Sequence, residues 1–190
     1  EDDEAAADAT ATATVVHEEK KLYTAENNAD IKRIEGSDNS TYAWGDLGSE
    51  MLHSSSAVIR GLTLNKVQVC AIALRLDPDQ DFVWHALADF LAWATRNNKK
   101  NKNKTTGGST STFTTPIIIN ITIGEETYEF TTPRACYLAA LSFDGMIGDC
   151  SDSLFHLGCT LTGDEQATIV FDTRYSSKKP MVLTKRQCFF

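Results

Sequence analysis

Two stretches of this chain lack the apolar side chains needed to build a hydrophobic core, and they limit how much of it can fold unaided. The first opens with Glu1-Asp2-Asp3-Glu4 and continues as an Ala/Thr stretch to residue 14. The second is the polar run at residues 97–112, NNKKNKNKTTGGSTST. Ordering a backbone costs roughly 1–2 kcal/mol per residue, which such segments cannot offset by burial. We therefore expect both segments to become ordered only against a partner.

The remaining sequence has the composition of one globular domain. The chain has 190 residues, of which 42% are hydrophobic and 23% are charged, so it can bury a substantial core. Its net charge of −8 comes from residues 1–50, where thirteen Asp and Glu stand against four Lys and Arg. This balance argues against nucleic-acid binding, which needs concentrated Lys and Arg. We predict an acidic extended arm at 1–50 and one α+β domain at 51–190, with a polar loop insertion at 97–112.

The periodicity predicts an α+β fold with a mainly antiparallel sheet, one clear helix and the long N-terminal arm. Asp77, Pro78 and Gln80 suit a helix start, and apolar residues then recur at helical spacing to about residue 96. A short helix at 133–141 has a strand as its alternative. The predicted strands lie at 57–64, 67–76, 117–123, 126–132, 154–161, 168–175 and 181–190. A β-sandwich with a helical insertion is the alternative architecture.

Markers of the cellular compartment point in two directions. The chain begins with Glu1 rather than Met, which predicts a processed mature form or a trimmed chain. Free or buried thiols favour a reducing compartment, whereas three glycosylation sequons would favour secretion. We expect an organelle, a plastid or a mitochondrion, with secretion as the alternative. The cysteines are Cys70, Cys136, Cys150, Cys159 and Cys188, and the sequons begin at Asn39, Asn103 and Asn120.

Candidate metal sites in the sequence are weak, and we predict no cofactor. Asp81, His85 and Asp89 recur every four residues on the predicted helix and could converge on a metal, but solvated helix faces have the same spacing. An acidic Gly-containing loop lacks the order of an EF-hand; its carboxylates belong to Asp144, Asp149 and Asp152.

Candidate nucleophiles are equally weak, and we predict a protein that is not an enzyme. His156 and Cys159 lie three residues apart in a predicted strand, which would put them on opposite faces. The serines at 54–56 lie outside a G-x-S-x-G elbow. An enzyme with Cys150 or Cys159 as nucleophile is the weakest alternative.

Eight residues are candidate contacts for a protein partner. Two aromatic residues in the arm would share one face of an extended chain, the lysines of the polar run could meet an acidic surface, and the C-terminus ends in two phenylalanines. These residues are Tyr42, Trp44, Lys99, Lys100, Lys102, Lys104, Phe189 and Phe190.

From these patterns we expect a non-catalytic accessory or structural subunit of a larger multiprotein complex, without a membrane-spanning segment. Deleting residues 1–44 should then weaken assembly and leave the domain folded. The main alternative is a secreted β-rich module that binds carbohydrate through an aromatic face such as Trp44 or Trp84.

Overall fold

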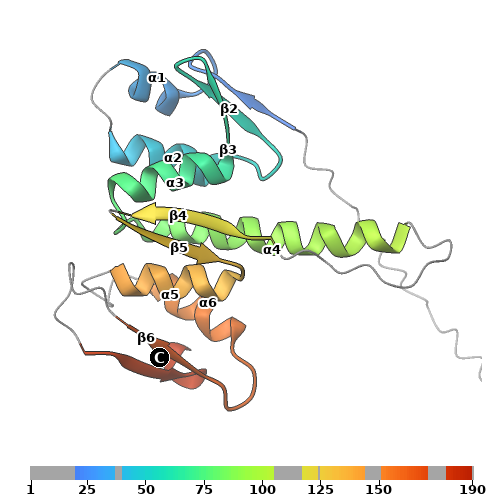
Figure 1. Ribbon diagram of the computed structural model, residues 1–190, viewed down its shortest axis with the longest axis vertical. Coiled ribbons are helices and arrows are strands. Elements are labelled where there is room, and N and C mark those ends of the chain that lie inside the picture. Colours follow the sequence, from blue (N-terminus) through green and yellow to red (C-terminus); the bar gives the residue numbers. More distant parts are fainter. Residues whose placement is uncertain are drawn as a thin grey trace, which may run out of the picture.

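The computed structural model describes residues 20–36, 40–104, 117–123, 125–143, 151–170 and 179–189. These residues form six α-helices and three small sheets of two or three strands, which follow one another along the long axis of the molecule (Figure 1). The prediction of a mainly antiparallel sheet with one clear helix is therefore wrong. The fold is α+β, and helices supply most of its packing surfaces.

One end of the molecule consists of a three-stranded sheet and three helices. Strand β1 (Leu22–Tyr23) pairs parallel to β2 (Ser56–Ile59), and β2 pairs antiparallel to β3 (Leu62–Asn65). The turn between β2 and β3 has positive φ at Arg60 and Gly61, as a tight two-residue hairpin requires. The helices of this end are α1 (Ala29–Gly36), α2 (Thr41–Glu50) and α3 (Lys66–Leu76).

Helix α3 replaces a predicted central strand. Its sequence is apolar on both strand faces, but a short apolar run is also compatible with a buried helix. The residues at the start of the segment favour the helix over the strand. The Asn65 side chain accepts a hydrogen bond from the Gln68 backbone N–H, and the Gln68 side chain accepts one from the Asn65 N–H, both at 2.9 Å. This capping box satisfies two backbone donors that a helix leaves open.

Residues 29–36 and 41–50 are helical, although the sequence predicted an extended arm there. Ile31 and Ile34 on α1 and Leu47 on α2 are fully buried and belong to the main hydrophobic core. We now expect deletion of residues 1–44 to unfold the domain, because the deletion removes part of that core. Residues 1–19 lie outside the described part of the chain.

The middle of the molecule is built on the long helix α4 (Asp81–Lys104), which packs against α2, α3 and α5. Its apolar stripe confirms the predicted helix. The helix continues beyond Arg96 into the polar run, because Lys is a good helix former and its charge is favourable at a helix C-terminus. Asp77, the predicted N-cap, instead ends α3.

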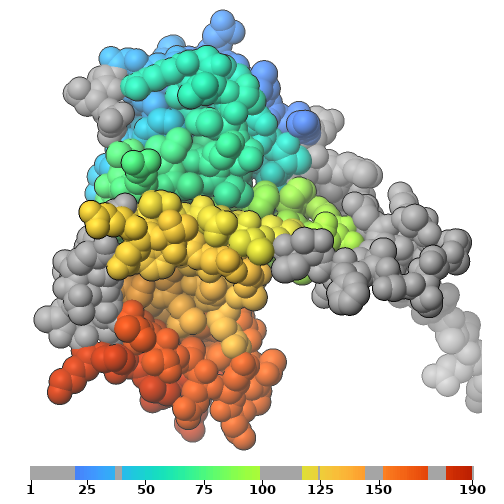
Figure 2. Space-filling model, viewed as in Figure 1, coloured from blue at the N-terminus to red at the C-terminus, as the bar shows by residue number. Residues whose placement is uncertain are grey.

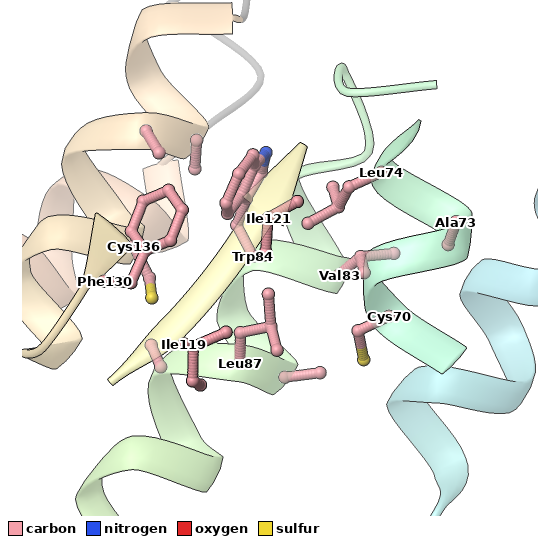
Figure 3. Close-up of a cluster of buried hydrophobic side chains, with 14 of the residues drawn as sticks. Cys70, Ala73, Leu74, Val83, Trp84, Leu87, Ile119, Ile121, Phe130 and Cys136 are labelled. Carbon is pink, nitrogen blue, oxygen red and sulfur yellow. The ribbon is translucent and has the colours of Figure 1, made fainter. Parts of the chain in front are cut away.

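The two strands predicted at 117–123 and 126–132 form a β-hairpin, which packs against α3. Strands β4 (Ile119–Ile123) and β5 (Glu126–Phe130) pair antiparallel, and the three isoleucines of β4 are buried on alternate positions. Figure 3 shows side chains from α3, α4, β4 and α5 meeting in one cluster. Trp84 is at its centre, with ring centroids 5.2 Å from Phe130 and 5.7 Å from Phe143.

The C-terminal unit forms the other end of the molecule (Figures 1 and 2). The short helix predicted at 133–141 is α5, and Thr132 Oγ1 accepts a hydrogen bond from the Ala135 N–H at its start. A strand was predicted at 154–161, where helix α6 occurs instead. The strand predicted at 181–190 is present only at 181–184, and a 3-10 helix follows it. The elements are α5 (Pro133–Phe143), α6 (Ser151–Thr160), β6 (Gln166–Ile169), β7 (Met181–Thr184) and the 3-10 helix η2 (Arg186–Phe189).

Candidate functional site

The two aromatic residues predicted as partner contacts near the N-terminus lie in helix α2 and face different ways. Tyr42 is exposed, whereas Trp44 is only 7% exposed and belongs to the hydrophobic core. Positions two apart point about 200° from each other around a helix, whereas they would share a face of a strand. Tyr42 alone is therefore available to a partner.

The lysines predicted as a basic contact occupy the C-terminal end of α4. Their side chains lie outside the described part of the structure. The backbone places Lys100 and Lys104 one turn apart on the helix. The four residues are Lys99, Lys100, Lys102 and Lys104.

One of the two phenylalanines predicted as partner contacts at the C-terminus belongs to an exposed aromatic pair. Phe189, on η2, is 39% exposed, and its ring meets that of Phe155 on α6 edge to face, with centroids 5.5 Å apart. Phe155 is 51% exposed. Phe190 lies outside the described residues. The sequence did not indicate Phe155, because its partner is distant along the chain and its segment was predicted to be a strand.

Gly158 allows this pair to form. A Cβ atom at Gly158 would lie 2.9 Å from the Cβ of Cys188 and 3.0 Å from the Phe189 ring. Such distances are far below normal contact, so only glycine lets η2 approach α6 this closely. The Cys188 side chain is buried at the same junction, which fixes the position of η2.

Basic side chains accompany the aromatic pair. Lys185 and Arg186 are exposed at the start of η2. Residues three apart in a 3-10 helix lie above one another, so Arg186 shares the side of η2 that presents Phe189. An apolar contact beside a positive charge is suited to a protein surface that combines apolar and acidic side chains. We call Phe155, Phe189 and Arg186 the aromatic docking site.

A second cluster brings together polar side chains from three helices. His85 on α4, Tyr137 on α5 and His156 on α6 have ring centroids 5.2–5.4 Å from one another. Nε2 of His85 also shares a 2.7 Å hydrogen bond with Oγ of Ser153, on the first turn of α6. We call these four residues the histidine cluster. The sequence had assigned His156 to a strand, so it could not predict this meeting.

A serine hydrogen-bonded to histidine is the arrangement of a nucleophile and its general base. Ser153, however, is 0% exposed and Tyr137 is 6% exposed, so a substrate cannot reach the hydroxyl in this conformation. Burial also raises the pKa of Tyr137 to about 12, which keeps the phenol neutral near pH 7. The geometry therefore describes a polar junction between helices and not an open catalytic site.

The cysteine thiols differ in accessibility. Burial raises the pKa of Cys70 and of Cys136 to about 12, which disfavours the reactive thiolate. Burial also raises the pKa of Cys188. Of the two candidate nucleophiles, Cys159 is exposed and Cys150 lies outside the described residues.

The other candidate sites receive no support from the described residues. Within these ranges, no three His, Cys, Asp or Glu side chains are arranged to hold a metal ion, and Asp81, His85 and Asp89 are no exception. Asp144 and Asp149 fall outside the described ranges. Trp84, a candidate carbohydrate platform, is 0% exposed and donates its indole N–H to the Pro78 carbonyl at 2.9 Å.

None of the helices in the described ranges is both long enough and apolar enough to cross a lipid bilayer. Comparisons with protein-family models, with curated proteins and with solved structures find no match to this sequence.

Proposed function

We propose that this chain is a non-catalytic subunit that binds another protein within a larger assembly, and that the aromatic docking site is its contact. The observation that carries the proposal is the exposed pair of Phe155 and Phe189, which pack edge to face beside Arg186. Aromatic and arginine side chains are enriched where proteins bind one another. The expected partner surface is apolar at its centre and acidic at its edge.

Further exposed apolar residues in the same unit support this choice. Val170, Met181 and Val182 lie on or beside β6 and β7 and are at least 37% exposed. Two strands alone make a marginal sheet with unpaired backbone edges, and partner proteins often add a strand to such an edge. A partner that covers η2 could extend over this hairpin. The organelle location remains a prediction, with secretion as its alternative.

The test compares two variants of the full chain in cells that naturally produce it. Phe155→Ser removes the more exposed of the two rings in the docking site. Leu62→Ser changes an exposed leucine on β3, at the other end of the molecule. On a native gel we expect the wild type and Leu62→Ser to migrate in a large complex. Phe155→Ser should migrate near the 20.9 kDa of the free chain, because the partner contact is lost.

Two results would contradict the proposal. One is migration of the wild type as a free monomer, and the other is equal incorporation of both variants. Sedimentation of the purified chain separates a further outcome: self-association through the same ring would make a second copy the occupant, not a different protein. Urea unfolding of each variant controls for loss of fold, and both midpoints should stay close to that of the wild type.

A further inference from the structure

The histidine cluster joins α6 to the rest of the fold. His85 links α4 to α6 through both a hydrogen bond to Ser153 and an edge contact with the His156 ring. On the other side, the His156 ring stacks on Tyr137 of α5, with planes 17° apart. One end of α6 is thus held against two helices by side chains whose charge depends on pH.

The surroundings of His85 favour its neutral form. Burial and the nearby His156 lower the pKa of His85 below its usual 6.5, and three carboxylates oppose this shift only in part. The carboxylates are Asp81 and Asp89 on α4 and Asp152 on α6. The Tyr137 phenol, from α5, and the Ser153 hydroxyl, from α6, are the uncharged polar groups that face it.

We propose that His85 and His156 form a proton-sensitive latch, which holds α6 against α4 while the His85 imidazole is neutral and releases it when acid protonates that imidazole. A charged His85 would have to leave part of its hydration behind and would lie against the His156 ring. Release of α6 exposes the His85 ring to water. This proposal does not depend on the aromatic docking site.

The direction of the pH effect follows from proton linkage. With α6 detached, His85 regains its usual pKa and binds a proton more readily than in the packed state. The detached state is therefore stabilised relative to the packed state as the pH falls through 6.5. Packing of α6 is strongest above this pH and weakens below it.

Hydrogen exchange of the full chain tests the latch. Backbone amide exchange in α6 is measured at about pH 7.5 and about pH 5.5, on either side of the usual histidine pKa, and corrected for the intrinsic effect of pH. We expect exchange in α6 to rise several-fold at the lower pH. Exchange in α3, which has no histidine, should change little.

Two variants assign the effect to its residues. His85→Gln keeps a hydrogen-bonding side chain opposite Ser153 but cannot take up a proton, so α6 should remain protected at both pH values. His53→Gln removes a histidine that stacks on Trp93 outside the cluster and should retain the wild-type response. Equal protection of α6 in the wild type at both pH values would overturn the proposal, even if a variant failed to fold. An unchanged acid response in a folded His85→Gln protein would also overturn it.

Discussion

Arg134 and Glu165 form a two-pronged ion pair that ties the start of α5 to the loop after α6. Both guanidinium nitrogens Nη1 and Nη2 donate to the Glu165 carboxylate, at 2.7 and 2.8 Å. Nη2 also donates to the carbonyl oxygen of Thr160, the last residue of α6. This paired geometry is the strongest arrangement of arginine with a carboxylate. It fixes the end of α6 opposite to the histidine cluster.

The ion pair predicts a loss of stability in acid. The hydrogen bonds from Arg134, assisted by Thr162, lower the pKa of Glu165 from 4.5 to about 2. A carboxylate with a lowered folded-state pKa stabilises the fold above pH 4.5, and this contribution disappears as the pH falls towards 2. We expect Glu165→Gln to have a lower urea midpoint than the wild type near pH 7, and the two to converge in acid.

Glu129→Gln is the control for this measurement, because it changes an exposed carboxylate on β5. Its urea midpoint near pH 7 should stay close to that of the wild type. If the urea midpoints of the wild type and Glu165→Gln instead differ by the same amount at every pH down to 2, the ion pair does not contribute to stability.

Lys66 predicts a second effect on stability. Its ammonium group is buried and donates to the carbonyl oxygens of Ser49, at 3.1 Å, and Met51, at 2.7 Å, at the end of α2. Lys66→Met keeps an unbranched side chain of similar length but leaves these carbonyls without the charged donor. We expect a loss of about 2 kcal/mol in the free energy of unfolding. Lys32→Met, at an exposed site on α1, should change it by less than about 0.5 kcal/mol.

Urea unfolding by circular dichroism measures both lysine variants. A Lys66→Met protein as stable as Lys32→Met would show that the two hydrogen bonds contribute nothing measurable.

Gly158 links stability to docking. Gly158→Ala would place a methyl group 2.9 Å from the Cys188 Cβ, and overpacking of this kind costs about 1–3 kcal/mol. The least expensive relaxation moves η2, and Phe189 with it. We therefore expect this variant to lose stability and also to incorporate less into the native complex. Gly36→Ala, where no atom lies within 4 Å of the new methyl, should change neither property.

Incorporation of Gly158→Ala at the wild-type level, measured on the native gel in a protein that has lost stability, would contradict the link. In that case the position of η2 would matter to the fold and not to the partner.

The sequence predicted those elements whose first residues or apolar periodicity can be recognised within the segment itself. The strand predicted at 117–123 and the short helix predicted at 133–141 are examples, and they are present as β4 and α5. The strand predicted at 67–76 was wrong because an apolar run fits a buried strand and a buried helix equally well. The Asn65–Gln68 capping box was the local signal that could have separated them.

The candidate sites were less accessible to sequence reasoning. Phe189 was predicted as a partner contact. Its contact with Phe155 could not be predicted, because it depends on α6 being a helix. The histidine cluster depends on three helices meeting, so no local spacing could reveal that His85 contacts Ser153. Trp44 was predicted as a partner contact but is buried, because α2 is a helix and not an extended segment.

Site-specific photocrosslinking tests the central claim most directly. A photoreactive amino acid replaces Phe155 in one full-length chain and Leu62 in another, and adducts formed in the native cells are identified by mass spectrometry. The account predicts that position 155 crosslinks to one protein with an acidic contact region and that position 62 does not. Equal labelling from both positions, or no adduct from position 155, would contradict it.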